Sequence, residues 1–332
     1  MHGDFLGRAK ADAWIYLTVL AYSAIIAVLS IYMGRPIDAI GRVYLGPWQT
    51  VLALALAVYL AQAALVSVRS GTPWQSFRER LRHLVSPRIV FGTCLFMLLG
   101  SFLGTFTVAK TLLEVISPFT WDIALADLDE GLHGGDPWRL FPAHHGFTRF
   151  IQWLYTPGWL LLLCGVSLYF CFTRDDVARR RYIGAFLFCW IFLGNVMALQ
   201  FHSAGPVFYS HSVQQSRFAP MLDYLEFSRD LPFSSVNISD HLWAMHARDE
   251  VSQGTGISAF PSLHLAMATL WFLALRKVHA LMGWVLSANV LLIQIGSVHL
   301  GWHYAIDGYF SIIATLLFWK LAGAQWLRQP IT

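Results

Sequence analysis

The chain has 332 residues, of which 56% are hydrophobic and only 13% are charged, about half the charged share of an average soluble domain. An aromatic content of 15% and a positive mean hydropathy exclude a disordered chain and a solvated coiled coil. The net charge of +4 is too small to indicate nucleic-acid binding, so we expect no nucleic acid and a bilayer as the surrounding medium.

Apolar runs of the length needed to cross a bilayer, about 20 residues, recur along the chain. They occupy residues 13–33, 49–68, 89–109, 151–173, 183–201, 262–275, 281–300 and 304–323, of which 262–275 is the short one. The first run resembles a signal peptide, but no small-residue cleavage site follows it, so we expect it to remain as an anchor. The predicted fold class is all-α, a polytopic membrane protein with about eight transmembrane helices.

Basic residues gather on one side of these spans. If both ends of the chain are cytoplasmic, the inner segments hold 15 of the 23 Lys and Arg but only five acidic residues, and the positive-inside rule selects this orientation. The connections 110–150 and 202–261 then lie outside. They lack clear secondary structure and are longer than a connection requires, which favours a functional role. An amphipathic segment on the membrane surface is expected around Trp121 to Leu132.

The first polar cluster is Ser258–His264, in which Pro261 and the serines signal the start of a helix. This start puts His264 in the first helical turn at the outer surface. The positive end of that helix would help to hold a phosphate group.

The second cluster is Ser297–Asp307, in which His303 and Asp307 are four residues apart and are expected on one helix face. The chain crosses the bilayer twice between His264 and His303, so both histidines lie on the same side. A neutral imidazole can attack phosphorus, a carboxylate can orient it, and a second imidazole can protonate the departing oxygen. These residues therefore indicate phosphoryl transfer.

Metal binding is a competing interpretation, because His299, His303 and Asp307 recur every four residues and His264 could be a fourth ligand. Gly301 argues against the continuous helix that this arrangement needs, and His299 alone is typical of a packing residue. We expect no metal and no cofactor.

The two clusters resemble a known family. Pro261–His264 and His303–Asp307 are similar to the second and third signature motifs of the phosphatidic acid phosphatase type 2 superfamily, in particular its inositol phosphorylceramide synthase-like branch. The resemblance implies a six-helix catalytic core over 89–323 after a two-helix extension 1–88, with 324–332 as a cytoplasmic tail. It also implies that His303 is the nucleophile, that Asp307 orients it and that His264 is the acid/base.

The first motif departs from the usual family pattern, because its lysine and Arg-Pro pair are missing. In its place stands His202–Tyr209, which is similar to the Gly-Pro motif of the branch. The residues expected to bind substrate are His202, Gly205, Pro206, Tyr209, Arg217 and Ser262. The arginine of the third motif would fall at Ser297 and is absent too. Segment 129–138 also looks like a recurring element of bacterial members, with a Gly-Pro-rich turn as the alternative interpretation.

Positive charge for the phosphate must come from elsewhere. The outer-side cations are Lys110, Arg139, Arg149, Arg217, Arg229 and Arg248. Arg217 is preferred because it lies near the Gly-Pro segment. The missing arginines suit a phosphodiester headgroup, which carries one negative charge, better than a phosphomonoester.

The resemblance thus implies a membrane enzyme that takes a phospholipid donor and transfers its phosphorylated headgroup to a lipid hydroxyl, with water as the acceptor in the phosphatase alternative. The expected location is the bacterial inner (plasma) membrane, with the active site on the extracytoplasmic face. A lipid transporter or flippase would instead carry charges at midplane on broken helices, and a scaffold gives no reason for this His and Asp spacing. The headgroup, the acceptor and the oligomeric state are not predicted.

Overall fold

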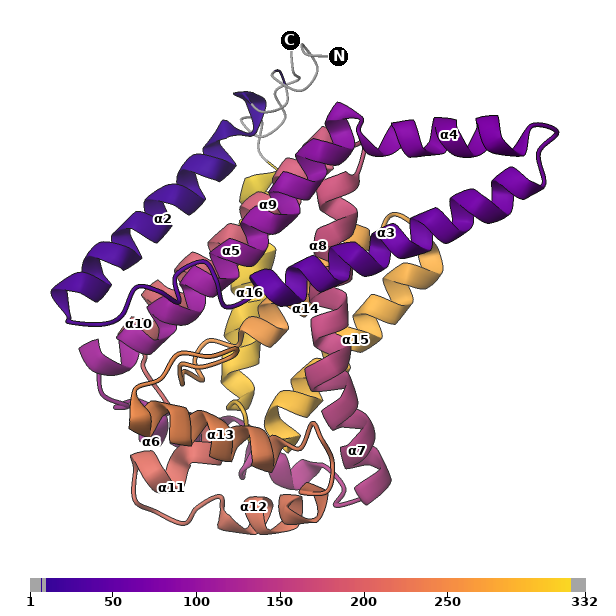
Figure 1. Ribbon diagram of the computed structural model, residues 1–332. Coiled ribbons are helices and arrows are strands. Elements are labelled where there is room, and N and C mark those ends of the chain that lie inside the picture. The colour runs from indigo at the N-terminus through magenta and orange to yellow at the C-terminus, as the bar shows by residue number, and fades with distance from the viewer. Residues whose placement is uncertain (1–6, 8–9, 324–332) are drawn as a thin grey trace. The chain divides into compact units, whose positions relative to one another are not determined.

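The computed structural model describes residue 7 and residues 10–323, which form helices joined by turns and irregular segments (Figure 1). Among these residues, seven helical stretches are long and apolar enough to cross a membrane. They are α2 (Ala13–Tyr32), α3 (Leu45–Val68), α5 (Pro87–Ile116), α7 to α8 (His145–Phe172), α9 to α10 (Asp176–Gln200), α15 (Ala280–His299) and α16 (Ala305–Ala322). The eighth apolar helix, α14 (Leu263–Leu275), is shorter. The predicted all-α polytopic fold is confirmed, and the predicted tail 324–332 lies outside the described residues.

Two of these stretches contain π-helical turns. The first runs from α7 (His145–Trp153) through η2 (Leu154–Gly158) to α8 (Trp159–Phe172), and the second runs from α9 (Asp176–Phe188) through η3 (Cys189–Met197) to α10 (Ala198–Gln200). Pro157 lies inside η2. Because proline has no N–H and its ring crowds the preceding turn, it favours such a local change of helix geometry.

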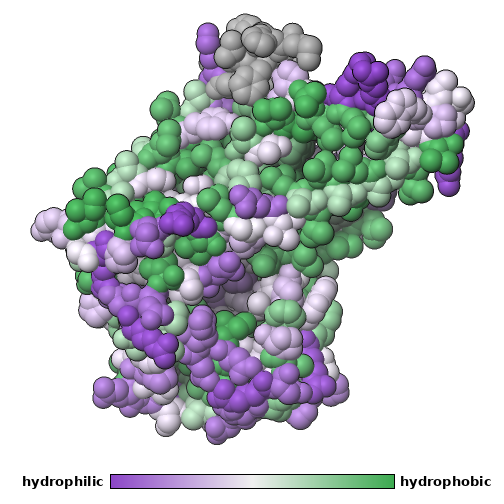
Figure 2. Space-filling model, in the orientation of Figure 1, coloured by the Kyte–Doolittle hydropathy of each residue, from purple (hydrophilic) through white to green (hydrophobic). Residues whose placement is uncertain are grey.

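The spanning helices present apolar side chains outward, as a lipid environment requires. On α2 the exposed side chains include Leu17, Leu20, Val28 and Ile31. In Figure 2, hydrophobic residues cover α3, whereas hydrophilic residues gather over α11 to α13. The bounds of these last helices are Tyr209–Ser212 for α11, Ala219–Leu225 for α12 and Ser235–Arg248 for α13.

The chain divides into two compact units. The first takes the described residues up to Thr105 together with Cys164–Arg180, so the predicted extension 1–88 falls within it. In this unit Asp12 is fully buried before α2 and accepts hydrogen bonds of 2.7 Å from both Arg179 and Arg180 of α9. These charge-assisted bonds fasten the start of α2 to the start of α9. The amphipathic helix α4 (Pro73–Leu84) also belongs here and has no buried residue.

The second unit takes Phe106–Leu163 and the described residues from Arg181 onward, and it contains both polar clusters. Its centre is α14, which packs chiefly on α15 and α16. Nine of the 13 residues of α14 are buried, among them Trp271. A helix buried on all sides by protein does not need the full length of a lipid-facing span, which explains why this apolar run is short.

The two long outer connections are largely helical, so the expectation that they lack clear secondary structure is wrong. The first contains α6 (Asp122–His133) and η1 (Pro137–Leu140), and the second contains η4 (Pro206–Phe208), α11, α12, η5 (Glu226–Ser228) and α13. The helix expected around Trp121 to Leu132 is therefore present as α6. In Figure 1 these short helices gather at the end of α15 and α16 where the two join. They surround the segments that carry the second polar cluster.

Candidate active site

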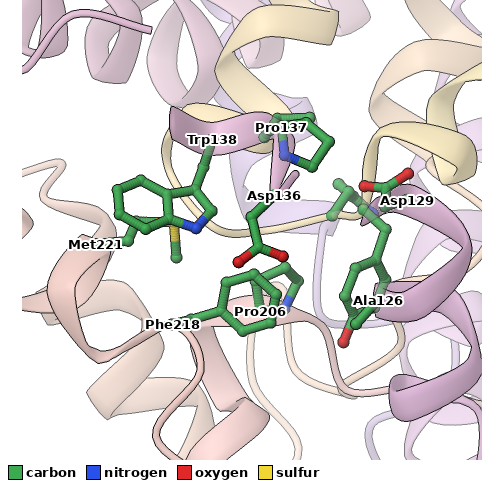
Figure 3. Close-up of a pocket in the computed structure, with 11 residues that line it drawn as sticks. Ala126, Asp129, Asp136, Pro137, Trp138, Pro206, Phe218 and Met221 are labelled. Carbon is green, nitrogen blue, oxygen red and sulfur yellow. The ribbon is translucent and has the colours of Figure 1, made fainter. Parts of the chain in front are cut away.

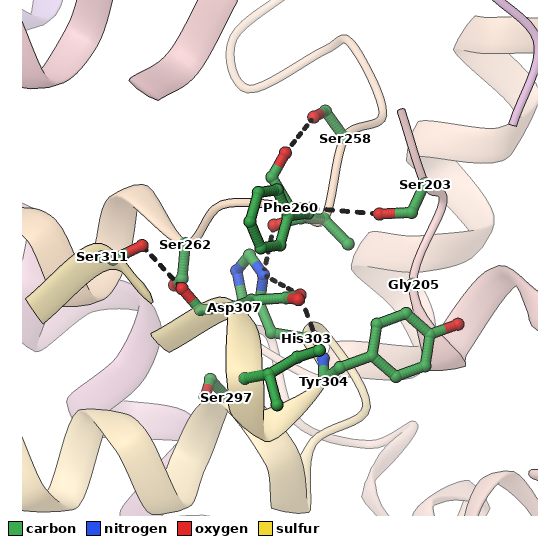
Figure 4. A network of polar contacts seen from close by, with 12 residues as sticks. Ser203, Gly205, Ser258, Phe260, Ser262, Ser297, His303, Tyr304, Asp307 and Ser311 are labelled. Carbon is green, nitrogen blue, oxygen red and sulfur yellow. Dashed lines mark hydrogen bonds and ion pairs between the residues drawn. The ribbon is translucent and has the colours of Figure 1, made fainter. Parts of the chain in front are cut away.

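His303 lies in the turn Leu300–Tyr304 between α15 and α16, where Gly301 has a φ of +75° that allows the chain to reverse. Its Nδ1–H donates to the carbonyl of Ala259 at 2.7 Å and lies 3.4 Å from Oδ2 of Asp307 (Figure 4). Since Nδ1 holds the proton in this arrangement, Nε2 carries the lone pair. Burial, with a contribution from Lys110, lowers the pKa of His303 to about 3, so the ring is neutral at pH 7.

Asp307 lies in the first turn of α16, and its carboxylate caps that helix. Oδ2 accepts from the backbone N–H of Tyr304 at 3.0 Å, and Asp307 is fully buried. The expectation that His303 and Asp307 share one helix face is wrong, because α16 begins only at Ala305. The two side chains nevertheless meet, since the carboxylate reaches back across the helix start in a capping box.

His264 stands in the first turn of α14, as predicted. The helix begins two residues later than the Pro261 signal suggested, with Ser262 as the N-cap that accepts from the N–H of Leu265. The imidazole stacks on Tyr155 at 4.3 Å between ring centroids and contacts the tilted ring of Trp159 at 4.2 Å. Tyr155 belongs to the π-helical turn η2 and Trp159 begins α8, so one continuous helical stretch supplies both aromatic rings.

The rings of His264 and His303 are 6.4 Å apart between centroids. The structure therefore brings together the two histidines that the sequence places 39 positions apart on the same side of the bilayer. At this separation both imidazoles can contact a single phosphoryl group.

The Gly-Pro segment is held against the turn Leu300–Tyr304 that carries His303, called the catalytic turn below because His303 is the proposed nucleophile. The N–H groups of Ala204 and Gly205 donate to the two carboxylate oxygens of Asp122 at 2.9 and 2.8 Å. Gly205 has a φ of +97°, and a Cβ there would come within 2.7 Å of the carbonyl oxygen of Trp302. Val207 N–H donates to the carbonyl of Gly301 at 2.7 Å. Only glycine fits at 205, so this motif residue is explained by close backbone approach.

Two carboxylates that sequence reasoning did not assign hold the catalytic turn. Asp122 accepts from the hydroxyl of Tyr304 at 2.8 Å in addition to its bonds to the Gly-Pro segment. Asp129 accepts from the N–H groups of Ala305 and Ile306 at 2.6 and 3.0 Å, at the start of α16. Both lie on α6. The only sequence signal was that Asp129 opens the 129–138 element, whose remainder is the predicted turn with Gly134 and Gly135 at positive φ.

Arg217 does not stand free beside the histidines. Its guanidinium donates to Asp127, Glu130 and Asp136 at 2.7 to 2.9 Å. Lys110 lies in the last two turns of α5, and its positive charge acts on both His264 and His303. The acidic group that acts on Lys110 is Glu114. The carboxylate oxygens of Glu114 are hydrogen-bonded to the His246 ring and to the backbone N–H of Ile257. Of the six candidate cations, Lys110 is thus the one whose charge reaches both histidines.

The remaining predicted substrate-binding residues hold the framework. His202 is buried, and its Nδ1–H donates to the carbonyl of Ser117 at 2.6 Å. Burial lowers the pKa of His202. Tyr209 is buried against Phe218, and Pro206 begins η4. These side chains position the Gly-Pro segment, whereas Pro206 also borders the pocket described next.

A small pocket opens beside His303 (Figure 3). Its cavity volume is about 10 Å³, which is room for about one water molecule. Asp136, Trp138, Phe218 and Met221 are among the residues that line it. It provides a space next to the proposed nucleophile.

The structure does not support the metal interpretation built on a continuous helix. His299 ends α15, and its Nε2 pairs with the hydroxyl of Thr148 at 2.8 Å. The turn at Gly301 then separates His299 from His303. Among residues 7 and 10–323, no group of three or more His, Cys, Asp or Glu has the geometry of a metal site.

The fold and this constellation define a class: polytopic helical membrane proteins with a buried His-Asp pair facing a second histidine. The chain belongs to the PAP2 superfamily, whose family pattern matches residues 121–321. The match takes in α6, the Gly-Pro segment and both histidine clusters. No curated protein and no solved structure matches the chain. Membership places the chain among phosphatases and phosphotransferases in general.

Proposed function

We propose that this protein is a lipid phosphotransferase that cleaves a phospholipid phosphoester through a phosphohistidine and passes the phosphorylated headgroup to a lipid hydroxyl, as in the inositol phosphorylceramide synthase-like branch. The observation that carries the proposal is the geometry of His303. Its Nδ1–H is held by Ala259 and Asp307, which leaves the Nε2 lone pair for attack, with His264 at 6.4 Å.

In the first half-reaction, Nε2 of His303 attacks phosphorus and an N–P bond forms. The P–O bond to the lipid alcohol breaks, and protonated His264 gives its proton to the departing oxygen. Asp307 stabilises the positive charge that develops on the His303 ring. The aromatic walls Tyr155 and Trp159 keep the His264 ring in one orientation during this transfer.

In the second half-reaction, the acceptor hydroxyl gives its proton to His264 as its oxygen attacks phosphorus, and the N–P bond breaks. His303 and protonated His264 are restored. A lipid hydroxyl as acceptor makes the protein a transferase, and water makes it a phosphatase.

The local charge supports a phosphodiester donor. Lys110 is the cation whose charge reaches both histidines, whereas Arg217 is occupied by three carboxylates. One ammonium balances the single negative charge of a phosphodiester, and a phosphomonoester would bring a second charge. We therefore assign the phosphate to Lys110 in place of Arg217, and favour headgroup transfer over hydrolysis.

The test is to trap the intermediate. The purified full chain is incubated with vesicles made from phosphorus-radiolabelled total phospholipids, and the protein is then analysed for acid-labile, base-stable label. Label is expected on His303 and absent in His303→Ala, which should also lose turnover by about four orders of magnitude because no other group replaces the nucleophile. Asp307→Asn should lower turnover about 100-fold.

His241→Ala is the matched control, since His241 is an exposed histidine of α13 in the same unit. It should label and turn over like the parent protein. Normal turnover by folded His303→Ala would overturn the mechanism.

A further inference from the structure

Helix α4 (Pro73–Leu84) connects two membrane-spanning helices of the first compact unit. The span α3 ends at Val68 and the span α5 begins at Pro87, so only residues 69–72 and 85–86 join α4 to them (Figure 1). Four extended residues reach at most about 14 Å. Because both spans end at a membrane surface, these short connections keep α4 next to the bilayer.

The sequence of α4 gives it an apolar side edged by arginines. When successive residues are placed 100° apart, four large apolar side chains fall within one arc of about 80°, and they are Trp74, Phe77, Leu81 and Leu84. Arg78 and Arg82 lie one turn apart along one edge of this apolar arc. Arg80 lies along the other edge.

The described part of the protein leaves much of this arc uncovered. No residue of α4 is buried, and Trp74 is 72% exposed. The hydrogen bonds between α4 and α3 lie outside the arc, since the hydroxyl of Ser67 bonds to that of Ser76 and the hydroxyl of Tyr59 donates to the carbonyl of Arg80 at 3.0 Å. An exposed tryptophan on an apolar arc beside a bilayer is typical of a helix that lies in the interface.

The charge of this segment is complementary to an anionic lipid surface. Residues 69–88 contain five arginines and one acidic residue, Glu79. Arg78 and Arg82 are exposed, so their guanidinium groups can reach phosphate oxygens, to which arginine bonds through two N–H groups. The positive-inside rule predicts that the segment is cytoplasmic, where the leaflet surface is negative.

We propose that α4 lies in the membrane interface and binds the headgroups of anionic phospholipids. Trp74 and Leu81 then contact the acyl chains. Arg78 and Arg82 contact phosphate groups at the edge of the arc. The site belongs to the first compact unit, whereas the candidate active site belongs to the second, so the proposal does not depend on the function proposed above.

The first experiment tests the position of α4 in the bilayer. A fluorescent thiol probe is attached to the full chain in vesicles, in a background without the native cysteines, at Leu81→Cys in the arc or at Glu79→Cys, about 160° away on the helix. Lipids brominated on their acyl chains quench a probe that contacts them. The probe at position 81 should be quenched strongly and the probe at position 79 weakly, because an interfacial helix buries its apolar side about 5–10 Å deep.

The second experiment tests the choice of lipid with the probe at position 81. Brominated phosphatidylglycerol is compared with brominated phosphatidylcholine in mixed vesicles. We expect the anionic lipid to be preferred by at least about fivefold, which is the factor that one basic residue contributes at an anionic surface. Arg78→Gln combined with Arg82→Gln should remove this preference.

Arg174→Gln combined with Lys277→Gln is the matched control, because it removes the same charge from exposed positions outside α4. This control should keep the preference for phosphatidylglycerol.

Three results would overturn the proposal. Weak quenching at both positions would mean that a second copy or another part of the protein covers the arc. Equal quenching by the two brominated lipids would exclude selection of anionic headgroups. A preference that survives loss of Arg78 and Arg82 would exclude these side chains as its source. None of these measurements requires turnover, so failure of the proposed function would leave them unchanged.

Discussion

Lys110 is the candidate cation whose charge acts on both His264 and His303. Its Cβ packs so closely on the loop that a Cβ at Gly256 would come within 2.7 Å of it. This close packing leaves no room for a side chain at position 256. Replacing the charge should affect phosphate binding in the transition state more than it affects folding.

We predict that Lys110→Met lowers kcat/KM for phospholipid turnover by about 100-fold, because it removes the positive charge that balances the developing phosphoryl charge. Lys110→Arg should retain part of the activity. Turnover is measured on phospholipid vesicles with the purified protein. Lys277→Met, at an exposed lysine after α14, is the control, and equal activity of the two Met variants would remove Lys110 from the site.

For single residues, the sequence predicted those with a distinctive spacing and missed those that accept hydrogen bonds from backbone amides. His264, His303 and Asp307 could be grouped by counting spans, and the structure brings them together. Asp122 and Asp129 could not be found, because their partners are amides of residues 82 to 177 positions away and amides leave no pattern in side-chain type. Arg217 was preferred for its proximity along the chain, which does not reveal the carboxylates that occupy it.

The start of α16 is the element on which the catalytic turn depends. The first N–H groups of a helix have no partner within it, and Asp129 satisfies two of them from another helix. A negative charge at this end also interacts favourably with the positive end of the helix dipole. His303 lies two residues before α16 and Asp307 lies in its first turn, so a shift of this end moves both.

Asp129→Asn should therefore lower the free energy of unfolding by about 0.5–2 kcal/mol, the range measured for loss of a helix cap, and lower kcat with little change in KM. Thermal unfolding in detergent and turnover on vesicles measure the two effects. Asp127→Asn is the matched control on the same helix, because Asp127 is 62% exposed and its pair with Arg217 is a surface pair. Unfolding and kcat equal to those of this control would contradict the role of Asp129.

Helices whose composition is uniformly apolar were predicted closely, whereas helices set by tertiary contacts were not. The spans from α2 to α16 follow from run length, since lipid demands it. The helices of the outer connections are short and of mixed polarity, and they are stabilised by packing on one another, as Phe208 is on Trp243. The π-helical turns η2 and η3 could not be predicted either, because the local sequence has the pattern of an ordinary apolar helix.

For the molecule as a whole, orientation in the membrane remains a prediction from charge. Counting spans along the sequence predicts that the segments with most Lys and Arg lie on the opposite side of the bilayer from His264 and His303. An even number of crossings, with α14 as the eighth, puts both ends of the chain on the basic side. This orientation predicts an active site that faces away from the cytoplasm.

Cysteine labelling tests this orientation in a background without Cys94, Cys164, Cys171 and Cys189. Gln253→Cys should react with a membrane-impermeant thiol reagent in intact cells, and Val177→Cys only after the cells are opened. Gln253 is chosen over its neighbour Gly254, whose φ of +79° disfavours any side chain. Labelling of Val177→Cys alone in intact cells would invert the topology and place the chemistry on lipids of the cytoplasmic leaflet.

The carboxylate of Asp122 joins segments that the ribosome makes at very different times. Ala204, whose amide donates to this carboxylate, follows Asp122 by 82 positions, and Tyr304, whose hydroxyl donates to it, follows by 182 positions. At about 5–20 residues per second, synthesis of the chain from Asp122 to Tyr304 takes roughly 10–35 s. During that interval His264 can already be in the membrane, while the turn that carries His303 has not yet been synthesised. The proposed lipid turnover therefore cannot begin until the chain has been made through Tyr304, the third partner of Asp122.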